Sequence, residues 1–314
     1  MTRCREGGFA TKQRCESNIV RAMHAISIGE ILWDVTPAGE FLGGAPFNFA
    51  YHLSRHGHRV SFISAVADDD RGRRILQRVG QSGISADFIH RTSDHPTGWA
   101  DVQRDENGEP HFVIHRPVAY DFLQVDDSAM HSLFSSNVDC IYFGTLQQMS
   151  ATARELTSRL MTAVPASRRF YDPNLRKDAF TPELVRDLLS KATIVKLSEQ
   201  EACTVAKIFS EKLTTLERFA RDFSQRFGWD AVAITRGAQG CAVLVGNQYI
   251  EAHPSAVEAV DPVGAGDAFC AAFLHGIASG LPCAQNADFA NRVAALIVSR
   301  KGAVPEWSAD EVNS

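Results

Sequence analysis

Short apolar runs and amphipathic stretches alternate along most of the chain. Runs rich in β-branched and aromatic residues predict buried strands at 25–29, 59–66, 138–143, 168–171, 193–197 and 231–235. Apolar residues at helical spacing predict helices at 47–55, 71–81, 152–162, 182–191, 199–206, 215–227, 268–278 and 287–299. Alternation of this kind predicts an α/β fold of three α/β/α layers, with helices on both faces of a mostly parallel central sheet.

One region breaks this alternation. Residues 99–104 and 111–116 have strand character and flank the sequence Asp105-Glu106-Asn107-Gly108. Asn-Gly is a strong signal for a tight hairpin turn, and no helical stretch belongs to this pair. The pattern predicts a β-hairpin apart from the main sheet. A further short extended segment is expected at 257–260.

Two glycines bracket an alanine just before the apolar helix at 268–278. Gly264, Ala265 and Gly266 therefore lie where that helix begins, and backbone N–H groups there have no intrahelical partner. Small residues let an anion approach these groups, which is the geometry of a phosphate site. Asp267 lies beside it, where a carboxylate can take a proton from a hydroxyl that attacks a phosphoryl group. Alternatively, Asp267 is a capping residue in a glycine-rich turn.

Known glycine motifs do not account for this loop. No Gly-Lys-Ser/Thr follows it, so it is not a Walker A loop, and it lacks the third glycine of a dinucleotide fingerprint. Gly29 is followed by Glu-Ile-Leu, so no such fingerprint follows the first strand either. A nicotinamide-dependent oxidoreductase is excluded on these grounds.

A second segment, Gly43-Gly44-Ala45-Pro46-Phe47-Asn48-Phe49-Ala50 followed by Gly57, changes the interpretation. Together with Asp-x-x-Gly-Ala-Gly-Asp at 261–267 it resembles the two signatures of the ribokinase-like, or PfkB, family of sugar kinases. The resemblance runs from about residue 26 to residue 307. It implies a kinase domain at 23–314, with strands around 34–45 and 95–121 forming a small β lid over the sugar. It also implies transfer of the ATP γ-phosphoryl group to a hydroxymethyl oxygen of a small sugar.

The resemblance assigns roles to individual residues. Asp267 would be the general base, with the backbone of Gly264, Ala265 and Gly266 as the anion hole. Asp34, Gly44 and Asn48 match substrate-contact positions, although Asp34 also fits a turn residue before Pro37. The nucleotide would lie against Lys196, Thr235, Arg236, Gly237, Gly240 and Asn291. For Arg236 an exposed turn arginine is the alternative, and for Asn291 a solvated helix face.

The same resemblance implies which residues act on bound ions. The family's Asn-x-x-Glu element corresponds to Ser198-Glu199-Gln200-Glu201, where serine replaces asparagine, and Glu201 would act on Mg²⁺ through water. A K⁺ ion is expected near the loop; its candidate region is Asp261, Val263, Arg300 and Gly302. Pro262 stands where threonine is common, and the backbone role of the loop is expected to survive this.

Segments 116–121, 143–147 and 171–176 resemble those of fructokinase-like members, so the first choice is fructose, phosphorylated at its 6-hydroxyl. Arg176 keeps 2-keto-3-deoxygluconate as an alternative, because in such kinases an arginine at this place serves the substrate carboxylate. Its other interpretation is a structural pair with Asp172 or another acid. Ribose or a nucleoside ranks third. A sugar sensor without catalysis is the rival of a different class.

The composition of the chain limits its classes of partner and its location but indicates no reaction. The net charge of −5 gives no reason to expect nucleic acid as a partner, and no apolar run approaches the roughly 20 residues that cross a bilayer. The seven scattered cysteines indicate reduced thiols in a cytoplasmic protein. Residues 1–22 are expected to be a disordered extension or to follow a mis-assigned start.

Two smaller patterns remain open. Trp99, Phe112 and Ile114 would give the lid an apolar face, which either joins two copies as a homodimer or covers the substrate. His52 and His56 have the spacing of metal ligands on a helix, but no third ligand is evident. A solvated helix face is therefore the favoured interpretation of these two histidines.

Overall fold

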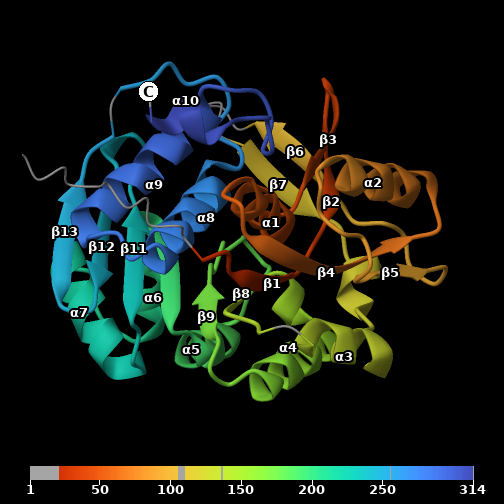
Figure 1. The fold of residues 1–314 in the computed structure, drawn as a ribbon, viewed down its shortest axis with the longest axis horizontal. Helices are drawn as coiled ribbons and strands as arrows, with labels where there is room; N and C mark the ends of the chain where they lie inside the picture. Colours follow the sequence, from red (N-terminus) through yellow and green to blue (C-terminus); the bar gives the residue numbers. More distant parts are fainter. Residues whose placement is uncertain (1–20, 105–109, 136, 255, 314) are drawn as a thin grey trace, which may run out of the picture.

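The computed structural model describes residues 21–104, 110–135, 137–254 and 256–313 (Figure 1). The predicted turn at 105–108 and most of the predicted extension at 1–22 lie outside these residues. Among the described helices, none has the length and apolarity that a bilayer crossing requires.

A nine-stranded sheet forms the middle layer, in the order β13-β12-β11-β10-β9-β8-β1-β4-β5. Neighbouring strands run parallel from β5 to β11, whereas β12 and β13 are antiparallel additions at one edge. The strands are β1 His24–Ile28, β4 Arg59–Ala67, β5 Ile89–Thr92, β8 Cys140–Phe143, β9 Arg168–Tyr171, β10 Ile194–Ser198, β11 Ala231–Thr235, β12 Cys241–Val245 and β13 Gln248–Ala252.

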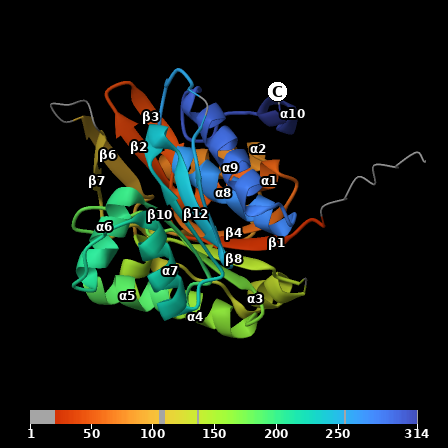
Figure 2. The ribbon, with the colours of Figure 1, turned by 90° about the vertical axis from the view of Figure 1, so that its left-hand side faces the viewer.

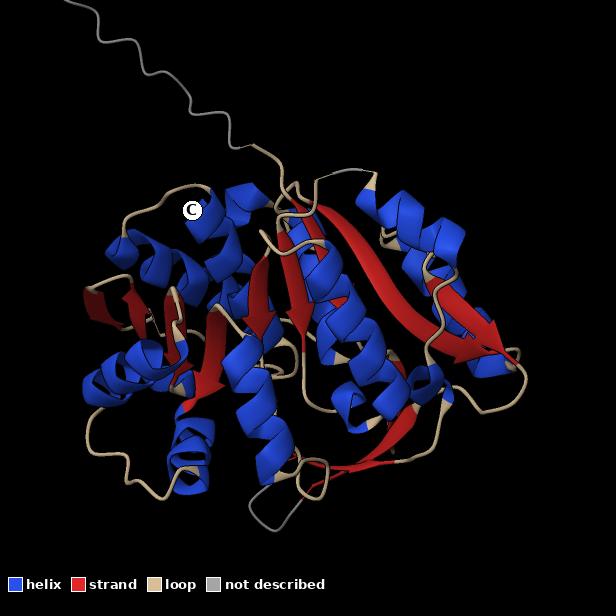
Figure 3. Cartoon of the chain, turned by 90° about the horizontal axis from the view of Figure 1, so that it is seen from below, coloured by secondary structure: helices blue, strands red, loops and turns tan. Residues whose placement is uncertain are grey.

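Helices cover both faces of this sheet, because its strands carry apolar side chains on both sides (Figures 2 and 3). One face holds α1 Ala45–Arg55, α2 Asp70–Gln81, α8 Ala265–Ala278 and α9 Cys283–Val298, with α10 Ala309–Asn313 against α9. The other face holds α3 Asp127–Phe134, α4 Ala151–Ala163, α5 Pro182–Lys191, α6 Glu199–Ile208 and α7 Leu216–Phe227. The three layers predicted from the sequence are confirmed.

A second sheet of four strands stands beside the first, in the order β3-β2-β6-β7. Its strands are β2 Leu32–Thr36, β3 Gly39–Gly43, β6 Trp99–Arg104 and β7 Pro110–Ile114. β6 and β7 form the predicted antiparallel hairpin, and β2 joins β6 in parallel. Leu32 and Ala100 of this sheet are buried against Tyr120 and Leu146, which anchors the small sheet on the main layer structure.

The short extended segment expected at 257–260 is not part of a strand, and one hairpin was missed. Val257 and Val260 are exposed, and the backbone amides of Val260 and Asp261 donate to the carbonyl of Val298 instead of pairing with a strand. The edge strands β12 and β13 were not predicted. The two-residue turn between them, Gly246-Asn247, is the signal that would have shown them.

The favoured interpretation of His52 as part of a solvated face is also wrong. Its side chain is fully buried: Nε2 donates to the carbonyl of Ala303 at 2.9 Å, and Trp307 Nε1 donates to its Nδ1 at 3.0 Å. Within the described residues, no three His, Cys, Asp or Glu side chains are placed to hold a metal ion. His52 therefore joins α1 to the C-terminal segment and serves packing.

Histidines also form a cluster where α1 ends against α8. The ring of His56 stacks on His275 with 4.7 Å between centroids, and His58 Nε2 lies 2.9 Å from His275 Nδ1. The backbone N–H of Met23 donates to His58 Nδ1, so Nε2 of His58 carries the proton that His275 accepts. Burial lowers the pKa of His56, His58 and His275, that of His58 to about 4.

This cluster predicts acid sensitivity. A histidine with a lowered pKa stays neutral in the folded protein but gains a proton on unfolding. Its contribution to the free energy of unfolding is therefore present above about pH 6.5 and is lost as pH falls towards about 4. The melting temperature should fall by several degrees between about pH 7.5 and about pH 5. His56→Phe should reduce that fall, whereas the exposed control His131→Gln should not. Equal pH slopes for all three proteins would contradict this account.

Candidate active site

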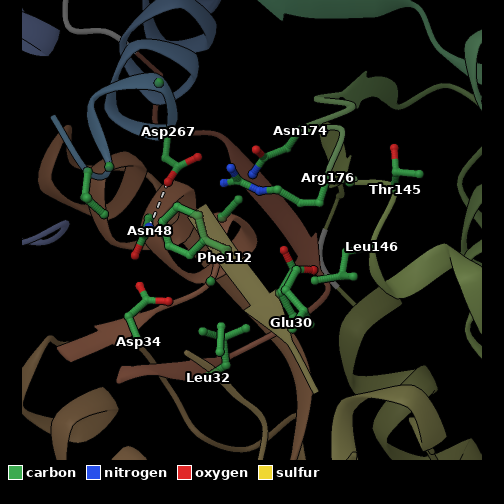
Figure 4. A pocket seen from close by; sticks show the side chains of 18 of the residues that line it. Glu30, Leu32, Asp34, Asn48, Phe112, Thr145, Leu146, Asn174, Arg176 and Asp267 are labelled. Atoms are coloured by element: carbon green, nitrogen blue, oxygen red, sulfur yellow. Dashed lines mark hydrogen bonds between the residues drawn. The ribbon is translucent and has the colours of Figure 1, made fainter. Parts of the chain in front are cut away.

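A cavity of about 340 Å³ opens where the parallel strands end. In open α/β sheets ligands bind at this edge, because the loops after neighbouring strands converge there. The segments after β1, β8 and β9 supply Glu30, Thr145 and Arg176, and the small sheet supplies Asp34 and Phe112 (Figure 4). Asp267 reaches the cavity from the first turn of α8. The predicted helix-start loop, the two signature segments and the hairpin thus meet in one place.

The loop before α8 has the backbone geometry of an anion site. Gly264 is the N-cap of α8 with φ of 82°, a conformation that favours glycine. A Cβ at this position would lie 2.5 Å from the carbonyl oxygen of Ala303, so a side chain here would also collide with the neighbouring segment. No side chain caps the helix, and Gly264 and Gly266 line the cavity. The N–H of Ala265, a predicted member of the anion hole, donates to the carbonyl of Pro262 at 3.3 Å. The N–H groups of Gly266 and Asp267 in this first turn have no intrahelical partner and are available to a bound phosphate.

Asp267 is buried, and its carboxylate is held in place. Asn48 Nδ2 of α1 donates to Asp267 Oδ2 at 2.8 Å, which joins the two signature segments directly. Burial raises the pKa of Asp267 to about 7, and the nearby charge of Asp172 adds to this, whereas Asn48, Lys196 and Arg176 act in the opposite direction. A carboxyl group with a pKa near neutrality can exchange a proton efficiently with a substrate hydroxyl. The capping interpretation is not supported by the geometry, because Asp267 lies inside the helix and its carboxylate faces Asn48.

Asp34 lies in strand β2 rather than in a turn, and its carboxylate faces the cavity (Figure 4). The Gly-Gly pair makes room for it: a Cβ on Gly43 would lie 2.5 Å from Asp34 Oδ2. Gly44, one residue on, lines the cavity with φ of 112°. Burial raises the pKa of Asp34 to about 6. Asp34, Gly44 and Asn48 were all predicted from the sequence, and the structure brings them together.

Arg176 lines the same cavity, and its guanidinium lies 4.7 Å from the centroid of the Phe112 ring. The alternative interpretation, a structural pair with Asp172, is not supported, because Asp172 pairs with Lys196 instead. Across the described ranges, Arg176 forms no ion pair within 4 Å. Its charge lowers the pKa of Glu30, Asp34 and Asp267, so it balances the acids of the cavity.

Lys196 and Asp172 form a buried ion pair behind the loop, with Nζ 3.2 Å from Oδ1. Tyr142 donates to the second oxygen of Asp172 at 3.0 Å. Burial alone would lower the pKa of Lys196, but the charge of Asp172 outweighs it and raises the pKa above its usual range. Lys196 Nζ would be 3.1 Å from a Cβ on Gly266, so its positive charge lies next to the anion loop.

Glu201 has a structural task in this geometry. With Ser198 it forms a capping box at the start of α6, and its other carboxylate oxygen accepts from the backbone N–H of Leu175 at 2.7 Å. The serine that replaces the expected asparagine is therefore the N-cap of α6. Glu201 holds the loop that carries Asn174 and Arg176, and it does not line the cavity.

The remaining predicted nucleotide residues lie near β11 and α9, outside this cavity. Arg236 turns towards Glu251 at 3.2 Å, and Thr235 donates to the carbonyl of Leu197 at 3.4 Å. Gly237 and Gly240 both have positive φ in the turn after β11. Asn291 is buried and donates to the carbonyl of Ala252 at 3.3 Å, so its interpretation as a solvated helix residue is wrong.

The predicted K⁺ region is a contact between two loops. Asp261 accepts hydrogen bonds from the backbone N–H of Val263 at 3.1 Å and of Gly302 at 3.0 Å. Arg300 instead points to the C-terminal segment, where it contacts Glu306 and Glu311. Asp261 thus fixes the start of the anion loop.

Three residues at this site were not among the predicted site residues. Glu30 follows β1 directly, and Asn174 lines the cavity with a φ of 43°. Asp172 is fully enclosed beside Lys196. The signal that points to Glu30 and Asn174 is their place just beyond the carboxyl ends of predicted parallel strands. No sequence signal shows that Asp172 pairs with Lys196 whereas Asn174 lines the cavity.

Comparisons with known proteins agree with this geometry. The model of the pfkB family carbohydrate kinases matches residues 29–309. The chain is 29% identical to the fructokinase of Escherichia coli over 296 residues, covering 88% of this chain and 94% of that one. Its fold is similar to a fructokinase with bound ATP from Xylella fastidiosa, with a TM-score of 0.81 and 24% identity over 92% of this chain and 97% of that one. It is also similar to a fructokinase from Vibrio cholerae with bound fructose, ADP and calcium ion, with a TM-score of 0.76 and 23% identity over 93% and 98%.

The matched region contains both the helix-start loop with Asp267 and the Gly-Gly segment with Asn48, which the hydrogen bond between these two residues unites. This chain belongs to the pfkB family of carbohydrate kinases, which are phosphotransferases that act on sugars.

Proposed function

We propose that this chain phosphorylates fructose at the 6-hydroxyl with ATP as donor. The observation that carries the proposal is the position of Asp267, between the anion loop and a cavity of the size of a small sugar. Names of relatives support fructose as the first choice, since the fructokinase of Escherichia coli is 29% identical.

In this mechanism Asp267 takes the proton of the attacking hydroxyl as the new bond to the γ-phosphorus forms, while the bond from that phosphorus to the bridging oxygen breaks and ADP leaves. Asn48 holds the carboxylate in position, and the backbone N–H groups at the start of α8 stabilise the charge on the transferred group. Asp34, Gly44, Asn48 and Arg176 would orient the sugar so that its hydroxyl lies in line with the phosphoryl group. Lys196, next to Gly266, adds positive charge on the phosphate side.

A Mg²⁺ ion bound with ATP would neutralise charge on the phosphates. The described residues fit an ion held by phosphate and water rather than by a protein cage, since no three ligating side chains converge. Glu201 already accepts three hydrogen bonds from Ser198 and Leu175, so it would reach such an ion through water. The nucleotide residues and the K⁺ region remain predictions. So does the homodimer, although Phe112 and Ile114 of the small sheet line the cavity and so favour a role in covering the sugar.

A specific observation favours 2-keto-3-deoxygluconate as the second candidate. Arg176 lies in the cavity without an acidic partner among the described residues, and a guanidinium is suited to bind a carboxylate. The test is ATP turnover by the purified protein with Mg²⁺ and K⁺ against fructose, the keto acid, ribose and adenosine. We expect the highest kcat/KM with fructose. A preference for the keto acid that Arg176→Gln abolishes would transfer the assignment to the sugar acid, and saturable binding without turnover would indicate a sensor.

A further inference from the structure

Glu30 is a buried acid that the mechanism above does not use. It lies just after β1, is 5% exposed and lines the cavity. Its Oε2 is buried and accepts no hydrogen bond in the described part of the chain. A buried polar group without a partner is costly, so such a group facing a cavity indicates that a ligand completes it.

Its position is well separated from the reacting atoms. Figure 4 shows Glu30 and Asp267 on opposite sides of the cavity, with the carboxylate of Glu30 directed towards the interior. Leu32, Ala100 and Leu146 also line the cavity and supply no side-chain hydrogen-bond group. The hydroxyl of Tyr120, whose pKa is raised by burial and by the charge of Glu30, forms no hydrogen bond within the described residues. A substrate that presents one end to Asp267 therefore presents its other end to Glu30.

The charges of the cavity decide which chemistry this end can have. Glu30, Asp34 and Asp267 are acidic, whereas the cations are Arg176 and Lys196, and Lys196 is already paired with Asp172. One arginine thus serves three carboxyl groups. Arg116, whose charge also acts on Glu30, is engaged by Asp121 and the carbonyl of Leu146. A substrate carboxylate at this end would meet the charge of Glu30, and Arg176, which three acids already share, would be the cation to offset it.

We propose that Glu30 is a specificity-determining residue that hydrogen-bonds a hydroxyl group of a neutral sugar and disfavours a sugar that carries a carboxylate. This inference rests on the proposed function. Burial raises the pKa of Glu30 to about 7, with Arg176 and Arg116 acting in the opposite direction. A carboxyl group near its pKa can both donate and accept, which matches a hydroxyl.

Two variants of this chain test the two parts of the proposal, which are the hydrogen bond to a sugar hydroxyl and the discrimination against a carboxylate. Glu30→Leu keeps the volume of the side chain but removes its hydrogen bonds, and should raise KM for fructose by about 10- to 100-fold with kcat changed less than about fivefold. Its melting temperature should not fall, because a buried carboxyl is replaced by an apolar group. Glu30→Gln keeps a donor and an acceptor but removes the charge, and should raise kcat/KM for 2-keto-3-deoxygluconate relative to fructose by about tenfold. The exposed control Glu183→Gln should change neither quantity.

The outcomes separate this inference from the proposed function. The sugar panel on the wild-type protein decides the substrate, and the ratios between variant and wild type decide the role of Glu30. If the wild type prefers ribose, fructose is lost as the substrate, but a raised KM for ribose in Glu30→Leu still supports the inference. If no sugar is turned over, calorimetric titration of fructose into wild type and Glu30→Leu gives the same comparison. KM or Kd within twofold of wild type in Glu30→Leu, or an unchanged substrate ratio in Glu30→Gln, overturns it.

Discussion

Asp267→Asn is expected to lower kcat with the preferred sugar by roughly 10²- to 10⁴-fold, with KM for the sugar changed by less than about fivefold. Asparagine keeps the shape of the side chain and can still accept from Asn48 Nδ2, but it cannot take a proton. The loss should therefore appear in the chemical step, measured as single-turnover rate with ATP and sugar. A variant that retains more than a tenth of wild-type kcat would remove Asp267 from the mechanism.

The same variant should be more stable than the wild type at alkaline pH. The pKa of Asp267 is raised to about 7, so the folded protein keeps this carboxyl protonated where the unfolded chain ionises. Its stabilising contribution is fully present below about pH 3.8 and is lost as pH rises through about 7. Asp267→Asn never carries this buried charge, and its advantage in free energy of unfolding should grow by about 2–3 kcal/mol between about pH 5 and about pH 8. Urea unfolding at both pH values measures the difference; an advantage that shrinks as pH rises would contradict the raised pKa.

The layers of the fold could be predicted because local pattern and tertiary role agree along most of the chain. The strand β4 is rich in β-branched and apolar residues and is buried after its first two positions, and α7 has one apolar face that packs on the sheet. The segment at 257–260 failed for the opposite reason. Its valines indicated a short extended segment, yet Val257 and Val260 pair with no strand among the described residues and stay exposed.

The site likewise contains residues that sequence motifs predicted and residues that they did not. Asp267 and Asn48 lie 219 positions apart, and two spaced motifs were sufficient to predict that they act together. Residues whose contacts are set only by the tertiary fold belong to no spaced motif. A structural pair between Arg176 and Asp172 was only the alternative interpretation of Arg176, and nothing in the local pattern shows that the sheet places Asp172 against Lys196 in the next strand. Likewise Oε2 of Glu30 is buried without a partner among the described residues because the small sheet and the loop after β8 close around it, which no local pattern encodes.

Removing one partner of the Lys196–Asp172 pair is the change expected to cost the most stability. The side chains are 9% and 0% exposed, so either single variant leaves a charge in a place that water does not reach. Asp172→Asn and Lys196→Met should each lower the free energy of unfolding by about 3–5 kcal/mol. Asp172→Asn also weakens the contacts with Tyr142 and Cys270, which donate to the same carboxylate.

The double variant distinguishes the effect of the ion pair on stability from the effect of Lys196 on turnover. Asp172→Asn with Lys196→Met removes both charges, so it should be more stable than the sum of the single changes predicts, by about 1–3 kcal/mol of coupling in a double-mutant cycle. Its turnover should stay low, because the positive charge beside Gly266 is gone. The matched control is the exposed pair Lys191–Asp187, also a lysine and an aspartate, 2.7 Å apart, whose coupling should stay below about 1 kcal/mol. Equal coupling in the two pairs would show that burial does not decide the strength of this interaction, and recovered turnover in the double variant would exclude Lys196 from the phosphate side of the site.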